Sequence, residues 1–243
     1  LFFVFAALFA SGPFTPAAAQ PFATPDPGKL KLASANAIII DAADGTPVYA
    51  KAADEVTPIA SLTKLMTAMV TLDAGLPLDE PVAVDVGDLD YIKGTRSRLG
   101  MGVELPRREM LRLALMASEN RASSALARHY PGGTAAFVAA MNDKAVALGM
   151  RRTRFADATG LSADNVSTAN DLARMVAAAS QYPLIREYST TASYFVEVQP
   201  SGRMLGFNNS NRLVASSEWD IQLQKTGYIR EAGRCLVMLA NIA

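Results

Sequence analysis

The apolar run Leu-Met-Thr-Ala-Met-Val at residues 65–70 constrains this chain more than any other segment. Together with Leu62, its larger side chains recur at positions i, i+3, i+4 and i+7, which places them on one face of a helix. Pro58 lies just upstream, where chains often turn into helices. We therefore predict a buried helix over about residues 61–72, against which the rest of the chain must pack.

The first turn of this predicted helix carries Ser61 and Lys64 on one face, because residues three apart are neighbours on a helix. A serine nucleophile needs a base that accepts its proton, and an amine can serve. The positive end of the helix is expected to lower the pKa of Lys64, and its free N–H groups can face an oxyanion. In the structural alternative, Ser61 is an N-cap and Lys64 is a solvated residue of the first helical turn.

Composition excludes several other kinds of site. Lys and Arg number 23, as do Asp and Glu, so no basic excess indicates nucleic acid as a partner. Cys235 is the only cysteine, so no internal disulfide can form. His129 is the only histidine, so a histidine-rich metal site is excluded and any Ser-His-Asp triad would have to use it. Because a helix-ending Tyr-Pro-Gly-Gly follows His129, we assign it a structural role and expect no metal and no cofactor.

The N-terminal region reads as a targeting segment. Residues 1–12 are apolar, uncharged and too short to span a bilayer, and residues 17–20 offer a small-residue cleavage site. We predict a signal peptide at residues 1–19 with its n-region missing, a Pro-rich linker at 20–32 and a catalytic domain at 33–243. An apolar N-terminal helix is the alternative. Export without disulfides fits the periplasm of a Gram-negative bacterium, without a transmembrane anchor.

The order of expected elements indicates the fold class. Strands are expected at residues 34–41 and 46–50, around an Asp-Gly turn; helices at 107–128, interrupted at 118–120, at 134–148 and from 169 to a break at 182–183; and strands at 194–198, 221–228 and 234–242. This order predicts an α+β fold, in which an antiparallel sheet from both chain ends is flanked by helices and a mostly helical region is inserted.

Two further motifs follow Ser61 in the chain. Ser118 and Asn120 frame a Ser-Glu-Asn segment, and Lys-Thr-Gly occupies residues 225–227 on a predicted strand. Each is weak alone, since a polar helix terminus or an edge strand with a turn glycine would look the same. S-x-x-K, S-x-N and K-T-G in this order, however, are typical of penicillin-binding proteins and class A β-lactamases.

On these motifs the sequence resembles, from about residue 33 to its end, the serine D-alanyl-D-alanine peptidases, which are the low-molecular-weight penicillin-binding proteins. Further matching segments are 58–69, 97–99, 113–120, 157–161, 167–172 and 209–213. Ser-Glu-Asn with residues 127–133 and 223–228 is most similar to the D-alanyl-D-alanine endopeptidase branch. The resemblance implies a β-lactamase/transpeptidase-like fold, peptidoglycan stem peptides as substrate and β-lactam antibiotics as covalent inhibitors.

The resemblance also assigns catalytic roles to residues. It implies that Ser61 attacks the carbonyl between two D-configured residues, that Lys64 takes its proton and that Ser118 relays a proton to the leaving amine. The backbone N–H groups of Ser61 and Tyr228 would form the oxyanion hole.

The remaining family positions are expected to bind substrate. Asn120 would hold the substrate amide and the Lys64 ammonium, Lys225 would add a positive field, and Thr226 would bind a carboxylate. Gly227 would let substrate approach the strand edge. Glu119 would either face the second stem of a cross-linked substrate or be a solvated helix-end charge.

Several functions remain in competition. We predict a DD-peptidase that cleaves D-Ala-diaminopimelate cross-links, with a D-Ala-D-Ala carboxypeptidase as the alternative. A class A β-lactamase would need a glutamate to activate water, and residues 151–167 contain none. A non-catalytic penicillin-binding sensor or scaffold is the third class. Family members continue beyond the strand at 234–242 with another strand and a helix, so we expect a clipped C-terminus and an exposed apolar edge.

Overall fold

The computed structural model describes residues 29–242. The expected signal peptide at residues 1–19, and the expected linker up to residue 28, lie outside the described residues. Residues 34–243 form one compact unit, and every element described below belongs to it.

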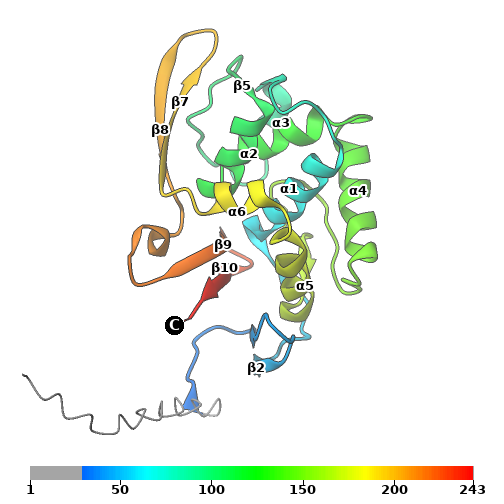
Figure 1. Cartoon of the computed structure of the whole chain (residues 1–243). Coiled ribbons are helices and arrows are strands. Elements are labelled where there is room, and N and C mark those ends of the chain that lie inside the picture. The colour runs from blue at the N-terminus through cyan, green and yellow to red at the C-terminus, as the bar shows by residue number, and fades with distance from the viewer. Residues whose placement is uncertain (1–28, 243) are drawn as a thin grey trace, which may run out of the picture. The chain divides into compact units, whose positions relative to one another are not determined.

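Six α-helices are found in the described part of the chain. They are α1 (Thr63–Asp73), α2 (Arg107–Met116), α3 (Asn120–Arg128), α4 (Gly133–Ala147), α5 (Ala169–Ala179) and α6 (Pro183–Ser189). A short 3-10 turn, η2 (Ala60–Leu62), leads into α1, and Figure 1 shows α1 inside the helical body. All five other helices contact α1.

The burial of α1 explains its central position. Leu65, Met66 and Met69 are completely buried, and every side chain from Thr63 to Thr71 is classed as buried. Burying one such large apolar side chain contributes about 1.5–3 kcal/mol. The predicted helix at residues 61–72 is therefore confirmed, and it forms the centre of the hydrophobic core.

The helical hairpin of α2 and α3 is broken at the predicted place. Ser118 has a φ of +58°, a left-handed conformation that ends the run of helical residues. The side chain of Glu119 then accepts a hydrogen bond from the N–H of Arg121 and caps α3. A polar three-residue break thus brings Ser118 and Asn120 to the junction of two buried helices.

The strands form five antiparallel pairs among the described residues. These are β1 (Ala37–Ile40) with β2 (Pro47–Lys51), β3 (Thr57–Pro58) with β6 (Val166–Ser167), β4 (Pro81–Ala83) with β5 (Glu104–Pro106), β7 (Ser193–Val198) with β8 (Arg203–Asn208), and β9 (Asp220–Ile229) with β10 (Gly233–Asn241). The α+β class and the antiparallel pairing are confirmed.

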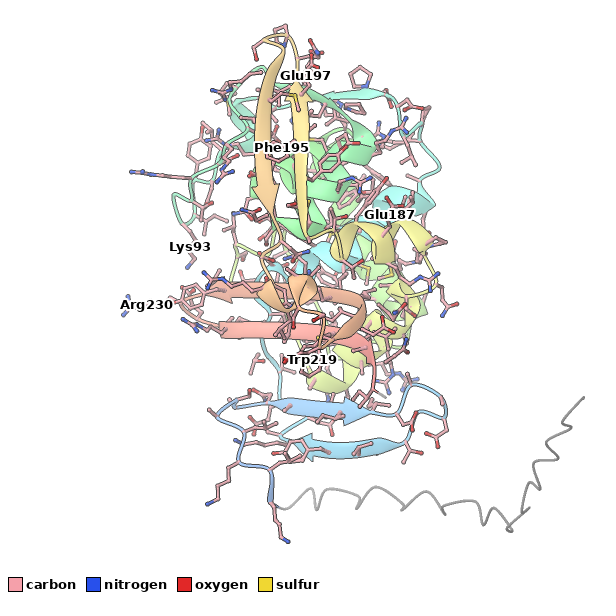
Figure 2. All side chains as sticks on the ribbon, turned by 60° about the vertical axis from the view of Figure 1, so that its left-hand side comes forward. Lys93, Glu187, Phe195, Glu197, Trp219 and Arg230 are labelled. Carbon is pink, nitrogen blue, oxygen red and sulfur yellow. The ribbon has the colours of Figure 1, made fainter. Side chains whose placement is uncertain are left out.

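One detail of the predicted sheet needs correction. The hairpins from the two chain ends, β1–β2 and β9–β10, are not joined in one hydrogen-bonded ladder. Figure 2 shows them one above the other, and no described strand bridges them. The strand at residues 34–41 was expected to be buried, but no residue of β1 is fully buried and Ile39 is 44% exposed.

The longest elements that the sequence analysis did not predict are α6 and β8. The helix break expected at residues 182–183 is present, since α5 ends at Ala179, but Pro183 also begins α6, where its missing N–H is no loss at the first helical position. The strand β8 contains Gly206, over which the ring of Phe195 from β7 lies. A glycine within a strand weakens its sequence signal, and here the cross-strand aromatic ring covers the glycine.

Candidate active site

Ser61 lies in the turn η2, between the strand β3 and the helix α1. Ala60, just before it, has a φ of +49°, which is uncommon for a residue with a Cβ. The turn is held from two sides by glycines. A Cβ on Gly160 would lie 2.0 Å from the carbonyl oxygen of Ala60, and a Cβ on Gly227 would lie 2.9 Å from the Ser61 nitrogen.

These contacts give Gly227 a different role from the one expected. The sequence predicted that this glycine leaves the strand edge open to substrate. In the structure the missing Cβ leaves space for the backbone of Ser61, so that β9 can pack directly against the turn. Gly160, which the sequence analysis did not single out, serves the same purpose from the other side and adopts a φ of +81°.

Lys64 is completely buried and its amine faces three oxygen atoms. Its Nζ donates hydrogen bonds to Ser61 Oγ at 3.0 Å, Asn120 Oδ1 at 2.7 Å and the Thr159 carbonyl oxygen at 2.6 Å. Two predicted partners and one unpredicted carbonyl therefore meet at a single amine. The solvated first-turn alternative for Lys64 is wrong.

The electrostatics of this amine favour a mixture of its two protonation states near neutral pH. Burial lowers the pKa of Lys64 from 10.5 to about 7, while the charges of Asp157 and Glu119 act in the opposite direction. The sequence predicted a lowered pKa but attributed it to the positive helix end. Removal of the ammonium from water is the larger cause.

The carbonyl of Thr159 is held by a loop organised around Asp157. One carboxylate oxygen of Asp157 accepts hydrogen bonds from the N–H groups of Thr159 and Gly160. The other accepts from Ser162 N at 2.8 Å and Asn165 Nδ2 at 2.9 Å. The Asp-x-x-Gly spacing is the signal that could have predicted this turn, because aspartate often binds backbone N–H groups just ahead in the chain.

The second motif contributes two residues to the site and one to the scaffold. Asn120, the first residue of α3, accepts from Lys64 and donates through Nδ2 to Thr95 Oγ1 at 2.9 Å. Glu119 is only 9% exposed and caps α3. It is therefore not a solvated charge, and its hydrogen bond is made to the backbone of its own helix.

The third motif lies on β9. Lys225 is completely buried, and its Nζ donates to the Thr226 carbonyl oxygen at 2.7 Å. Burial, and secondarily the charge of Lys64, holds the pKa of Lys225 well below its usual value. Thr226 Oγ1 lies 2.6 Å from Ser210 Oγ in a hydroxyl pair that sequence reasoning did not predict.

A pocket of about 450 Å³ opens above these residues. Its walls are formed by Ser61, Lys93, Thr95, Ser118, Asn120, Leu161, Thr226, Gly227, Tyr228, Ile229 and Arg230. Six of the eight residues predicted for the site line it, while the two lysines of the motifs lie buried outside the lining. The structure thus brings three distant segments of the chain together, as the motif order predicted.

Other features of the described residues bear on the remaining predictions. His129 is the C-cap of α3, and its ring nitrogen lies 3.2 Å from Arg128 Nη1, away from the pocket lining. Within residues 29–242, no group of three potential metal-ligating side chains is found. Over the same residues, no helix has the length and apolar character needed to cross a membrane.

Comparison with known proteins places this geometry in context. Residues 20–243 match the model of the D-alanyl-D-alanine carboxypeptidase family. The chain is 50% identical to a D-alanyl-D-alanine endopeptidase of Pseudomonas aeruginosa over 89% of this chain and 70% of the relative. It is 48% identical to a D-alanyl-D-alanine endopeptidase of Escherichia coli over 96% of this chain and 75% of the relative. The crystal structure of a Streptomyces DD-transpeptidase superposes with a TM-score of 0.81 at 29% identity, covering 88% of this chain and 87% of the other.

Proposed function

The chain belongs to the D-alanyl-D-alanine carboxypeptidase family and is a serine-type D-Ala-D-Ala peptidase, and we propose that it cleaves D-Ala-diaminopimelate cross-links of peptidoglycan. The endopeptidase names of the Pseudomonas aeruginosa and Escherichia coli relatives support this choice of bond. The observation that carries the proposed mechanism is the amine of Lys64, held 3.0 Å from Ser61 Oγ in a dry site.

The proposed reaction begins with the neutral amine of Lys64. Ser61 Oγ bonds to the carbonyl carbon of the D-Ala residue while its proton passes to Lys64 Nζ. The oxyanion that forms is bound by the backbone N–H groups of Ser61 and Tyr228. The position of the Ser61 nitrogen beside Gly227 supports this, because it brings the turn close to the β9 backbone that carries Tyr228.

The acyl-enzyme then forms as the C–N bond breaks. The Lys64 ammonium returns its proton through Ser118 to the leaving amine, and Ser118 lines the pocket in its left-handed conformation. Water hydrolyses the ester with Lys64 again accepting a proton, which releases the acyl stem and restores Ser61. A β-lactam would acylate Ser61 by the same first step and remain attached, because its leaving group stays tethered in the site.

Substrate binding is assigned to polar groups on the two walls. Asn120 would bind the amide of the acyl stem, since its side chain is fixed by Lys64 and Thr95. Thr226, supported by Ser210, would bind the carboxylate on the D-centre of the leaving group. Lys225 would act behind Thr226, because its amine is bonded to the Thr226 carbonyl and lies outside the pocket lining.

The proposed substrate sets the place of action. Peptidoglycan lies outside the cytoplasmic membrane, so the enzyme would work in the periplasm of a Gram-negative bacterium. The apolar segment and cleavage pattern at residues 1–20 support export by a signal peptide.

The nucleophile is tested by labelling with a fluorescent penicillin. Ser61→Ala is expected to abolish labelling while circular dichroism shows an intact fold, because no other serine is bonded to Lys64 Nζ in the described residues. Ser217→Ala, which changes an exposed serine outside the pocket, is the matched control and should label normally. Stoichiometric labelling of the Ser61→Ala variant would remove Ser61 as the nucleophile.

The bond that is cut is tested by mass spectrometry of muropeptides after digestion of cross-linked sacculi. Conversion of dimers to monomers is the expected result, with weaker release of D-Ala from pentapeptides. Release of D-Ala with dimers left intact would favour the carboxypeptidase alternative and leave the family and the mechanism unchanged. Rapid turnover of penicillin would instead favour a β-lactamase.

A further inference from the structure

Two cations of the active-site pocket have no part in the mechanism above. Lys93, in the loop before β5, and Arg230, directly after β9, both line the pocket that contains Ser61. Figure 2 shows both side chains on the same flank of the molecule. The pocket lining contains no aspartate or glutamate, so this part of it is suited to an anion.

One of the two cations is paired with a carboxylate in the free protein. Lys93 Nζ forms an ion pair with Glu231 Oε1 at 2.6 Å, which links the loop to the β9–β10 turn. The hydrogen bond from Lys93 lowers the pKa of Glu231, and the charge of Arg230 makes a smaller contribution in the same direction. Arg230 is exposed and makes no hydrogen bond or ion pair of its own with another residue in the described range 29–242. An excess of positive charge therefore remains at the pocket rim.

The strand β9 indicates which part of a substrate meets these cations. Side chains alternate along a strand, so Thr226 and Tyr228 lie on the same face of β9, and Arg230 lies in the turn directly after the strand. Gly227 lies beside the Ser61 nitrogen. With the leaving-group carboxylate at Thr226, the residues beyond Gly227 lie on the acyl side of the cleaved bond, and Arg230, three residues after Gly227, is at most about 10 Å from it.

That distance matches a charged part of the stem peptide. An extended peptide advances about 3.3 Å per residue, so a stem lying along β9 meets Arg230 two or three residues before its terminal acyl D-Ala. The γ-linked D-glutamate lies two residues before that D-Ala and carries a free carboxylate. Diaminopimelate lies one residue before it and carries a second carboxylate on the D-centre at the end of its side chain. Both sources offer the same chemistry to a lysine and an arginine.

We propose that Lys93 and Arg230 form a carboxylate-binding subsite for the acyl-side stem, with Glu231 as an internal competitor for Lys93. The proposal rests on the proposed function, because it places the stem by the role given to Thr226. The subsite would lower KM for stem peptides and leave the chemical step unchanged, since it lies far from the reacting atoms. Penicillin, which has no stem, would not use it.

The test compares Arg230→Gln, Lys93→Gln and the double variant with the wild-type enzyme. The substrates are a cross-linked stem dimer and a monomeric stem pentapeptide. Each is prepared in three forms: with both carboxylates free, with the acyl-side D-glutamate amidated, and with diaminopimelate amidated at its free carboxylate. The double variant is expected to lose about tenfold in kcat/KM through KM, with penicillin acylation within about twofold of wild type. Arg203→Gln, an exposed cation on β8 outside the pocket, is the matched control.

The source of the carboxylate is read from the amidated substrates. Amidating the recognised group should cost the wild type about tenfold and remove its advantage over the double variant, while amidating the other group should not. Glu231→Gln should raise kcat/KM by freeing Lys93. An equal loss on all substrates, or a parallel loss of penicillin acylation, would overturn the subsite. Dimer and pentapeptide carry the same acyl-side stem, so a wrong bond preference would not be mistaken for a missing subsite.

Discussion

The start of α1 and the middle of β9 each carry a completely buried lysine, and the two are built for different tasks. Lys64 Nζ meets a hydroxyl, a side-chain carbonyl and a backbone carbonyl, and nearby negative charges oppose the loss of its proton. Lys225 Nζ bonds to one backbone carbonyl, and the like charge of Lys64 opposes its protonation.

This difference shows that burial alone does not produce a useful base. Desolvation lowers the pKa of both lysines, but only Lys64 has compensating negative charge, which keeps its pKa at about 7. An amine with that pKa is partly neutral at physiological pH and can both accept and return a proton. Lys225 supports β9 through its bond to the Thr226 carbonyl, and the positive field that the sequence predicted for it stays a prediction.

The most severe test of this contrast exchanges each lysine for arginine. Arginine keeps its proton at neutral pH, so Lys64→Arg should slow penicillin acylation by about 10²–10⁴-fold, the usual contribution of a general base. Lys225→Arg should slow penicillin acylation by less than about a tenth of the factor found for Lys64→Arg, because Lys225 accepts no proton in the proposed mechanism. Stopped-flow acylation rates measure both variants. Equal losses would mean that the two lysines are not functionally distinct.

The two glycines that hold the Ser61 turn provide a second test of the two regions. Gly160→Ala would place a Cβ within 2.0 Å of a backbone oxygen, and Gly227→Ala within 2.9 Å of a backbone nitrogen. Neither backbone atom can move without displacing Ser61. Gly160→Ala should therefore lower acylation by about a hundredfold and reduce the unfolding temperature, with a smaller effect of Gly227→Ala.

Gly45→Ala is the matched control for these two variants. Gly45 has a φ of +78°, close to that of Gly160, but an added Cβ would meet no atom within 4 Å. It should lose about 1–2 kcal/mol of stability from backbone strain and retain normal acylation. If all three variants are acylated at the same rate, the close approach of Gly160 and Gly227 to the backbone of Ala60 and Ser61 does not position Ser61.

Near neutral pH, a smaller change of about tenfold per pH unit is expected from titration of Lys64. In the proposed mechanism the neutral amine of Lys64 accepts the Ser61 proton, so the acylation rate should rise with pH through its pKa of about 7. Below that pH the rate should fall by about tenfold per unit, because the neutral fraction falls in that proportion. Penicillin acylation measured from pH 5 to 9 gives the profile. A flat profile over this range would contradict Lys64 as the titrating base.

Much of this site was predictable because its residues carry local signals. The helical spacing behind Ser61 specified α1, and the motif order predicted that Ser61, Asn120 and Thr226 would share one pocket. The lowered pKa of Lys64 was also predicted, although from the wrong cause, because burial of a lysine depends on contacts from α3 and the 157–161 loop that the helix sequence does not contain.

What could not be predicted depends on contacts between distant segments. The role of Gly160 follows from the approach of its loop to Ala60, a hundred positions earlier in the sequence. The pairing of Ser210 with Thr226 requires the path between β8 and β9. Alternating hydrophobicity specifies how the two strands of one hairpin pair, but not which other strand lies beside that hairpin. The sequence therefore could not predict that the hairpins at the two chain ends are separate.

The last and smallest predicted effect tests the charge that distinguishes Lys64 from Lys225. Glu119 was expected to face substrate or solvent, but it is buried at the α3 cap and its charge raises the pKa of Lys64. Glu119→Gln keeps an oxygen that can cap Arg121 N and removes the charge. The pKa of Lys64 should then fall, because its ammonium loses a favourable partner, and the rise of acylation with pH should move to lower pH.

The matched control for this charge is Glu119→Asp, which keeps the carboxylate on a shorter side chain. Acylation rates at pH 8, where Lys64 is already mostly neutral, should change less than about twofold in Glu119→Gln, whereas rates at pH 6 should increase. A rate that falls at every pH would mean that Glu119 acts through the fold of the α2–α3 break. A profile that moves to higher pH would reverse the sign of its electrostatic effect and remove the explanation given for the difference between the two buried lysines.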